Sequence, residues 1–412
     1  MSIALIDYGC HSFSYRLATT LRQRGASVNY LVNASLQSPN LSSLAQWVAN
    51  TPGMVRTISC DKPYSKMGLR SRLKGEMEWG RTCVSVLQQI RPSAIIVNCV
   101  PLAAVAPIHR WARNHNIPFI YWLQDIQSRA IHDLLGHKFG IAGRTLGAFA
   151  QIWEQDILEQ SDMVITIAPG HEKELPPAVL RSGRHALLQN WANIEEFPDY
   201  PVDNAWSRRH GLNRTTNIMY SGTLGMKHDL GTFIALATHF QSRPEVRVVI
   251  VSSDQAAEKV RLKAVSLGLS NLIVLPFQPY ADVPQVLASA AVLIAPLDAS
   301  AGAFCVPSKI LSYLCAGRPT VIAIEESNAA ALTIRNASAG FVVPPGHPDQ
   351  FVASVENLLD DSALRRAAGA AARSYAESTF GIENIVDRFV KILCRVNLKF
   401  ALPQLTQPAI AS

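Results

Sequence analysis

The segment from Val306 to Ile324 places a loop, a short helix, a turn and a β-branched strand in direct succession. Ser308 is a residue type that caps helix N-termini, and Gly317 suits the left-handed conformation that follows a last helical turn. Pro319 prevents the helix from continuing, and the apolar residues after it favour a strand. A helix that leads at once into a short apolar strand is typical of a parallel sheet, so the chain is predicted to be an α/β protein.

Lys309 occupies the first turn of this predicted helix, where a cation normally opposes the helix dipole. Free N–H groups at a helix N-terminus bind anions, and a lysine beside them adds a full positive charge. These residues therefore indicate a site for an anion such as a phosphate. An ordinary surface lysine on a structural αβ unit explains the same pattern equally well.

The same segment also carries a family resemblance. Its residues 307–323, PSKILSYLCAGRPTVIA, resemble a block of the family 4 retaining glycosyltransferases of GT-B fold. Four further blocks occur in the family's order: SDMVITIAPG at 161–170, LLQNWANIEEF at 187–197, SGTLGMKHDLGT at 221–232 and GFVVPPGHP at 340–348. Together the blocks extend over nearly the whole chain, and they look most like those of bacterial enzymes of capsule, O-antigen and colanic-acid synthesis.

Two successive β-α-β series divide the chain into two halves. The resemblance implies two doubly wound Rossmann-like domains that face a cleft, with the C-terminal helix crossing back to the first domain. The expected parts are an acceptor-binding domain over 1–197, a linker over 198–213, a nucleotide-sugar-binding domain over 214–380, the returning helix over 381–397 and a tail over 398–412.

Composition narrows the class of protein further. Of the 412 residues, 48% are hydrophobic and 17% are charged, which excludes a disordered chain. Seven dispersed cysteines lack C-x-x-C spacing, so no zinc cluster or redox motif is indicated, and their number fits a reducing cytosol. The first residues read as a strand rather than a signal peptide, and the longest apolar stretch, 94–108, is too short to span a membrane. We therefore expect a cytoplasmic protein.

The net charge of +7 suits an anionic partner, either a nucleotide diphosphate or a membrane surface. Nucleic acid is disfavoured as a partner, because the sequence has no basic-aromatic stripe or binding motif. In the region 61–91, seven cations alternate with Met, Leu and Trp side chains. This pattern predicts peripheral docking on the inner face of the cytoplasmic membrane. A solvated charged face, with the apolar residues turned to the core, is the alternative.

The turn after the first predicted strand contains a single glycine, so the G-x-G-x-x-G pattern of dinucleotide enzymes is absent. The resemblance places Gly9, His11 and Ser12 of this turn at the acceptor side of the cleft. A plain βα turn is an equally good interpretation.

A second polar pair, Gln124 and Asp125, follows the predicted strand 119–123, where ligands bind beyond the carboxyl ends of parallel strands. Many family members have His-Asp at this place, and here Gln124 stands in the position of the histidine. Asp125 is then the carboxylate that can orient an acceptor hydroxyl or act as a base, or it simply caps a loop.

The turn of the second half, 221–227, combines Gly222 with Lys227, which suits close approach of a diphosphate. Thr223 stands where family members commonly carry an arginine. The family's Glu-x₇-Glu motif maps to Phe304 and Ser312, so the usual acidic contact to the ribose is missing. The expected catalytic residues are Asp125, Lys227 and Lys309. The expected donor-binding residues are Gly222, Thr223, Lys227, Phe277, Gly302, Ser308, Lys309 and Ser312.

These features predict a retaining glycosyltransferase that uses a nucleotide-diphosphate sugar of UDP or GDP type. No metal or other cofactor is expected, because a D-x-D pair is missing and lysines are available to neutralise the diphosphate. The expected acceptor is a saccharide or a polyprenyl-diphosphate-linked saccharide. A non-catalytic nucleotide-sugar-binding module is the alternative from a different class. A GT-B sugar-nucleotide epimerase is weaker still, because the cluster of acids and histidines that such enzymes use is not found.

Overall fold

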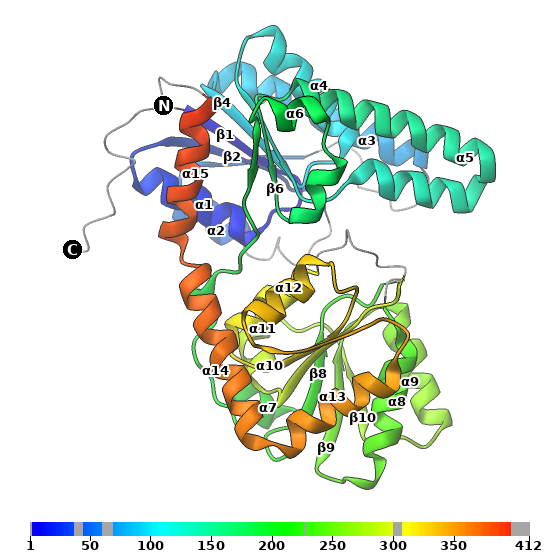
Figure 1. The fold of residues 1–412 in the computed structure, drawn as a ribbon. Coiled ribbons are helices and arrows are strands. Elements are labelled where there is room, and N and C mark those ends of the chain that lie inside the picture. Colours follow the sequence, from blue (N-terminus) through cyan, green and yellow to red (C-terminus); the bar gives the residue numbers. More distant parts are fainter. Residues whose placement is uncertain (1, 37–43, 60–68, 226–227, 300–306, 397–412) are drawn as a thin grey trace. The chain divides into compact units, whose positions relative to one another are not determined.

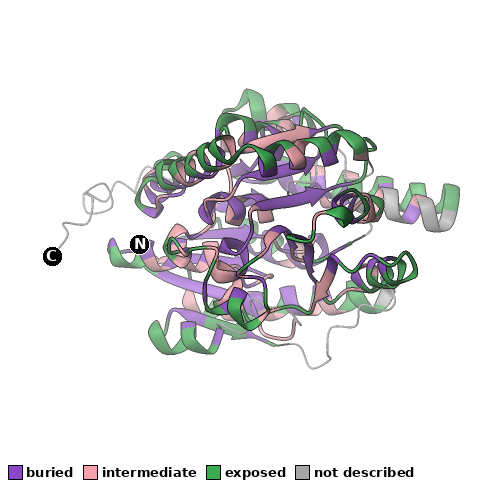
Figure 2. Ribbon diagram, turned by 90° about the horizontal axis from the view of Figure 1, so that it is seen from below, coloured by how far each residue is buried: buried purple, intermediate pink, exposed green. Residues whose placement is uncertain are grey.

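The computed structural model describes residues 2–36, 44–59, 69–225, 228–299 and 307–396 (Figure 1). The chain divides into two compact units, one of Met1–Gln189 with Ile382–Ser412 and one of Asn190–Gly381. The central strands of both sheets are buried between helices whose outer faces are exposed (Figure 2). None of the described helices is long and apolar enough to cross a bilayer.

In the described part of the first unit, seven strands form one sheet in the order β3-β2-β1-β4-β5-β6-β7. All neighbouring strands pair in parallel. The strands are β1 (Ser2–Asp7), β2 (Ser27–Asn33), β3 (Val55–Ile58), β4 (Ala94–Asn98), β5 (Phe119–Leu123), β6 (Met163–Thr166) and β7 (His185–Leu187). Parallel strands need crossover connections, and helices supply them here. These helices are α1 (Ser12–Gln23), α2 (Leu44–Asn50), α3 (Leu69–Ile90), α4 (Leu102–Asn114), α5 (Gln127–Gln160) and α6 (Pro177–Arg181).

The last helix, α15 (Ile382–Val396), belongs to the first unit although it ends the described chain. Arg24, at the end of α1, has a nearly buried side chain that pairs with Glu383 and Asp387 of α15. Phe389 of the same helix packs against Trp122, with 5.5 Å between the ring centroids. The predicted return of the C-terminal helix to the first domain is therefore confirmed.

The described residues of the second unit form a six-stranded sheet in the order β10-β9-β8-β11-β12-β13, again entirely parallel. The strands are β8 (Thr216–Ser221), β9 (Val246–Val251), β10 (Leu272–Leu275), β11 (Val292–Pro296), β12 (Thr320–Ala323) and β13 (Gly340–Val343). The helices are α7 (Ala205–Arg209), α8 (Leu230–His239), α9 (Gln255–Ser266), α10 (Val283–Ala288), α11 (Lys309–Cys315), α12 (Ala329–Asn336), α13 (Pro348–Asp360) and α14 (Ser362–Thr379).

The segment 198–213, expected to link the domains, lies within the second unit and contains α7. Asn204 caps this helix in a reciprocal capping box with Ser207, and Trp206 is fully buried. One helical turn is too short to show a periodic pattern, which explains why the sequence reads as irregular here.

The region 61–91 contains α3, and residues 60–68 of it lie outside the described part of the chain. Trp79 is fully buried and meets Tyr8 edge to face, with 4.8 Å between the ring centroids. The expectation that this tryptophan contacts lipid is wrong, because it packs in the core. Leu73 and Met77 do remain exposed on α3.

Gly80 of α3 allows the close packing of α3 on α4. A Cβ at Gly80 would lie 2.4 Å from the carbonyl oxygen of Ala104, whereas a Cβ at Gly75 of the same helix meets nothing within 4 Å. We expect Gly80→Ala to lower the free energy of unfolding by about 1–3 kcal/mol, through overpacking. The matched variant Gly75→Ala should leave stability unchanged or raise it by up to about 1 kcal/mol, through helix propensity. Urea unfolding of both variants measures the difference, and equal effects would contradict this account of the packing.

Candidate functional site

Each sheet has one place where the strand order reverses, and ligands of open α/β sheets bind beyond the carboxyl ends of the strands at that place. In the first unit the reversal lies between β1 and β4, and in the second between β8 and β11. The residues that follow these strands are therefore the first candidates for function.

At the end of β1, the fully buried carboxylate of Asp7 organises the following turn. Its Oδ1 accepts hydrogen bonds from the Gly9 N–H at 3.0 Å and from His11 Nδ1 at 2.8 Å. Its Oδ2 accepts from the His11 N–H at 2.8 Å and from the Tyr30 hydroxyl at 2.9 Å. The ring of His11 then covers Gly9, where a Cβ would lie 2.0 Å from His11 Cε1. A larger residue at position 9 would therefore displace the ring of His11 from its place beside Asp7.

Asp7, His11 and Cys99 bring potential metal-ligand atoms within 4.8 Å of one another. A carboxylate offers about four lone-pair sites, and the four hydrogen bonds to Asp7 occupy them. A metal ion would have to displace these donors, so the cluster fits a buried ion pair better than a metal site.

The charges of this pair stabilise each other. Burial alone would raise the pKa of Asp7, but the charge of His11 and the hydrogen bonds from His11 and Tyr30 lower it overall. Burial alone would lower the pKa of His11, but Asp7 raises it well above the ordinary value. We infer that His11 is an imidazolium with a side chain 30% exposed, which places one positive charge at the first switch point.

Gln124 joins a hydrogen-bonded chain at the ends of β4 and β5. Its amide donates to Asn98 Oδ1 at 2.7 Å, and the amide of Asn98 donates to Ser14 Oγ at 2.8 Å. Asp125 is exposed in the bend before α5. The start of α5 is held by the buried Glu154, which accepts hydrogen bonds from the Gln127 and Ser128 N–H groups and from the Ser128 hydroxyl. Asp125 therefore sits on a fixed backbone with its side chain in solvent.

In the second unit, Lys309 and Gly222 come together as the sequence predicts. Gly222 has φ +133°, which disfavours other residues, and a Cβ there would lie 3.5 Å from Lys309 Cε and Nζ. The ammonium of Lys309 donates to the hydroxyl of Tyr220, stands 3.8 Å from the centre of that ring and lies 3.4 Å from His228 Nε2. Burial raises the pKa of Tyr220, which therefore stays a neutral phenol. The tyrosine thus fixes the lysine charge directly beside the glycine turn.

The N-terminus of α11 differs from the prediction. Ser308 has helical angles, φ −58° and ψ −25°, and its side chain makes no capping hydrogen bond, whereas a capping residue needs an extended backbone. The N–H groups of Ile310 and Leu311 already donate to the carbonyls of Pro307 and Ser308. The site in this unit is therefore defined by the side chain of Lys309 more than by the helix terminus.

The other predicted donor residues have separate positions. Thr223 is exposed after Gly222, and Ser312 is half-buried on α11. Phe277 is exposed after β10, and its N–H donates to Ser253 Oγ at 2.8 Å. Lys227, Gly302 and Phe304 lie outside the described residues.

Two family models match the chain. Residues 9–191 match the "Glycosyl transferase 4-like domain", and residues 215–361 match "Glycosyl transferases group 1". Together the two matches cover most of both units. The chain belongs to this family of glycosyltransferases.

A curated relative agrees with this assignment. A GDP-mannose-dependent monoacylated alpha-(1-6)-phosphatidylinositol monomannoside mannosyltransferase of Corynebacterium glutamicum is 26% identical over 210 residues, which are 50% of this chain and 55% of that protein. The chain thus matches about half the length of this curated relative.

Solved structures extend the likeness to both units. HepE of Anabaena, in complex with UDP and glucose, has a TM-score of 0.71 at 16% identity, over 95% of this chain and 99% of that one. Sucrose-phosphate synthase of Thermosynechococcus elongatus has a TM-score of 0.69 at 16% identity, over 97% and 100%. The GT-B class of two Rossmann-like domains, predicted from the sequence, is confirmed.

Several residues of this glycosyltransferase's candidate site were not predicted. Asp7 carries a signal that sequence reading can detect, since it is a charged residue at the end of an apolar strand. Tyr220 carries no such signal, because a tyrosine within an apolar strand is typical of a core residue. His228 carries none either, because its contact is with Lys309 from another element. Asn98 lies at a strand end as well, but its role depends on a partner from another strand.

We expect Asp7→Asn to lower the unfolding free energy of the glycosyltransferase by about 3 kcal/mol or more, because it leaves a buried cation without its partner. The lowered pKa of Asp7 makes its contribution present above the ordinary value of 3.8 and lost as the pH falls through the folded value. The raised pKa of His11 makes its contribution full below the ordinary 6.5 and lost as the pH rises through the folded value.

The difference between wild type and Asp7→Asn should therefore be largest between about pH 4 and 6.5 and should shrink at higher pH. Denaturant unfolding across this range measures it. Tyr30→Phe, which removes the hydroxyl that donates to Asp7 and to the His11 carbonyl but removes no charge, serves as the control and should cost about 1 kcal/mol. A difference between wild type and Asp7→Asn that does not change with pH would contradict the ion pair.

Proposed function

We propose that this protein is a retaining glycosyltransferase that moves a sugar from a nucleotide-diphosphate donor to a saccharide or lipid-linked saccharide acceptor, in bacterial surface polysaccharide synthesis. The observation that carries the donor half is the ammonium of Lys309 beside Gly222, at the switch point of the second sheet. The Corynebacterium relative is described as GDP-mannose-dependent and HepE was solved with UDP, so both names support a donor of UDP or GDP type.

Lys309 acts on the leaving group in this proposal. As the bond between the anomeric carbon and the diphosphate oxygen breaks, negative charge grows on the diphosphate, and a fixed ammonium stabilises it. Lys227 and the backbone near Gly302 are assigned to the same diphosphate from the sequence alone, and Ser308, Ser312, Thr223 and Phe277 to the rest of the donor. The lysines take the place of a divalent metal, so the reaction is expected to proceed in the presence of EDTA.

The first unit supplies the acceptor side. The acceptor hydroxyl attacks the anomeric carbon from the face that the diphosphate leaves, and its proton passes to Asp125 or to a donor phosphate oxygen. Gln124, Ser12 and Gly9 are assigned to acceptor contacts, with the imidazolium of His11 next to them. A polyprenyl-diphosphate-linked acceptor would place the reaction on the cytoplasmic face of the membrane.

A panel of UDP- and GDP-sugars tests the proposal in purified protein. A donor at 100 times its Kd should stabilise the protein by about 2.7 kcal/mol in a thermal shift assay. The selected donor is then tested for transfer and hydrolysis with and without EDTA, and NMR of the product reads the anomeric configuration. Donor binding without any turnover would favour a non-catalytic binding module, and inversion of configuration would exclude a retaining mechanism.

We expect Lys309→Ala to reduce turnover at saturating donor about a hundredfold, equivalent to about 3 kcal/mol of transition-state stabilisation. The matched control is Lys263→Ala, which removes an exposed lysine from α9 of the same unit and should leave turnover unchanged. Circular dichroism checks that both variants are folded. Near-normal turnover of Lys309→Ala would rule out the leaving-group role.

We expect Asp125→Asn to reduce transfer at least tenfold, in line with loss of a general base, while the donor Kd stays the same. Calorimetry measures donor affinity and product formation measures transfer. Glu159→Gln, an exposed acid of the same unit, is the control. If donor binding collapsed in Asp125→Asn, the carboxylate would belong to the donor site or to the fold.

A further inference from the structure

The two arms of α5 form a tightly packed hairpin. The helix is interrupted at Gly140, which has φ +58° and ψ −131°, so residues 127–139 and 141–160 run as two arms (Figure 1). A Cβ at Gly143 would lie 1.9 Å from the carbonyl oxygen of Leu135, and a Cβ at Gly147 would lie 2.4 Å from the Cα of His132. The second arm therefore meets the first through its glycines, and the large apolar side chains between 141 and 153 are exposed.

These side chains form an apolar stripe of Ile141, Leu146, Phe149, Ile152 and Trp153. All five are exposed among the described residues, and Ile141, Phe149 and Ile152 are 84%, 65% and 66% exposed. Arg144 is the one charged residue of the sequence from 141 to 153, and no acidic residue occurs there. Most other large apolar side chains of this unit are buried, and an exposed group of them on one helix marks an interaction surface.

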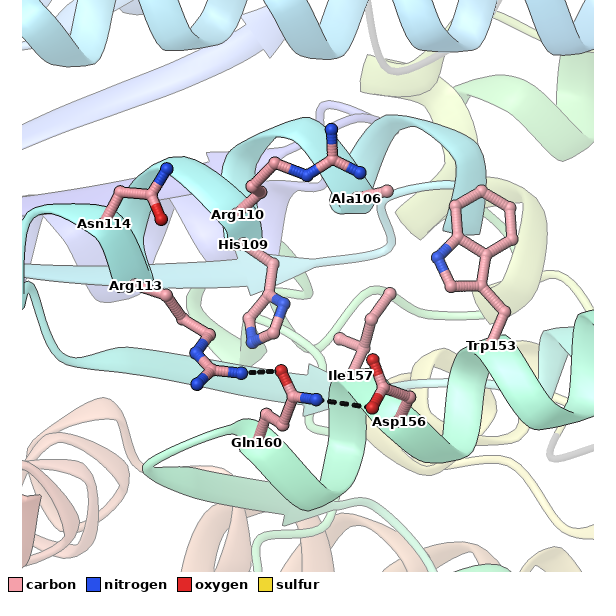
Figure 3. A pocket seen from close by; sticks show the side chains of 9 residues that line it. All are labelled: Ala106, His109, Arg110, Arg113, Asn114, Trp153, Asp156, Ile157 and Gln160. Carbon is pink, nitrogen blue, oxygen red and sulfur yellow. Dashed lines mark hydrogen bonds between the residues drawn. The ribbon is translucent and has the colours of Figure 1, made fainter.

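The stripe continues into a basic pocket between α4 and α5. The pocket has a volume of about 290 Å³, and its lining includes Arg110 and Arg113 of α4 and Trp153 and Gln160 of α5 (Figure 3). Arg113 donates to the side chain of Gln160, which in turn donates to Asp156. The lining holds two arginines and one carboxylate, that of Asp156, so the pocket favours an anion. Trp153 belongs to both the stripe and the pocket, and its amphipathic ring suits a boundary between apolar and polar surroundings.

We propose that the stripe and the basic pocket together dock this protein on an anionic lipid surface, with apolar side chains among the acyl chains and lipid phosphates at Arg110 and Arg113. Residues with large apolar side chains next to arginines match the layered chemistry of a bilayer interface. The inference deepens the proposed function, since a lipid-linked acceptor is found at a membrane, but its test does not depend on transfer.

Two other occupants fit less well. A second copy of the chain would bring the same face against itself about a two-fold axis, so the interface would gather Arg110, Arg113 and Arg144 of both copies. An anionic surface complements these charges instead. The α3 region, which the sequence suggested for this role, turns its tryptophan into the core, and from 71 to 90 its exposed large apolar residues are Leu73 and Met77.

The test is cosedimentation of the full chain with vesicles of phosphatidylcholine alone and of phosphatidylcholine mixed with phosphatidylglycerol. Wild type should bind the mixed vesicles more tightly, and high salt should weaken this binding. The triple variant Phe149→Ser, Ile152→Ser, Trp153→Ser should lose binding at least tenfold, because each apolar side chain contributes to partitioning. Arg110→Gln with Arg113→Gln should lose about fivefold per charge on mixed vesicles and little on neutral ones.

The matched control is Leu73→Ser with Met77→Ser on α3, which should bind as wild type does. Melting temperatures confirm that all variants are folded, and sedimentation velocity without lipid reports the oligomeric state. Equal wild-type binding to both vesicle types, or unchanged binding of the triple variant, would overturn the proposal. A dimer that the triple variant dissociates, without any vesicle binding, would assign the stripe to a second copy and overturn it as well.

Donor hydrolysis or transfer to a short soluble acceptor is measured in parallel. The triple variant and the arginine variant should retain it, since none of these residues belongs to the candidate site. Loss of vesicle binding with full turnover therefore tests docking alone, and vesicle binding by a protein without turnover would leave docking standing while the proposed function fails.

Discussion

Parallel strand pairing is the constraint on which both units depend. A parallel strand can be added only through a crossover, and the parallel direction of the strands places every carboxyl end at one edge of the sheet. When the chain adds strands first on one side of its first strand and then on the other, two neighbouring connections leave in opposite directions and open a crevice. β1 and β4 create that place in the first unit, and β8 and β11 create it in the second. The functional side chains can then come from the short turns that follow these strands.

The residues at the two switch points differ in kind. In the first, a buried carboxylate accepts hydrogen bonds from the Gly9 and His11 N–H groups and holds the backbone of its turn. In the second, Gly222 carries no side chain, and Lys309 reaches its turn from a different element. The phenol of Tyr220 beneath the ammonium gives the lysine a defined position that solvent alone could not give. Rigid charge beside an open backbone turn is what stabilisation of a leaving diphosphate requires.

The sequence predicted the strand 119–123, a continuous apolar run, and β5 has these bounds. It did not predict β3 and β7, which are short strands far from the centre of the first sheet, where burial imposes a weaker pattern. Ser308 shows a different limit, because its residue type predicts a cap while its backbone angles prevent one.

In the candidate site, some residues can be recognised from their own chemistry and others only from their partners. Gly222 and Lys309 are recognisable because turn chemistry and charge are properties of single residues. Tyr220 and His228 are not, because their role arises only when α11 brings a lysine onto the end of β8. A side chain whose function depends on a partner some 80 positions away in the chain looks like any other core aromatic in a one-dimensional reading.

The second arm of α5 inverts the usual pattern of a helix in a globular domain. An amphipathic helix on a soluble protein turns its large apolar residues toward the core and its small or polar residues outward. Here Gly143 and Gly147 face the neighbouring arm, and Phe149 and Ile152 face away from it. Small residues at a helix contact, spaced four apart, are the solution that helices adopt in lipid, where no hydrophobic force drives large side chains together and close backbone packing holds the pair. A sequence reader who counts apolar residues assigns this arm to the core. The direction of the glycines reverses that assignment, because the arms meet through Gly143 and Gly147 and Phe149 is left exposed for another surface.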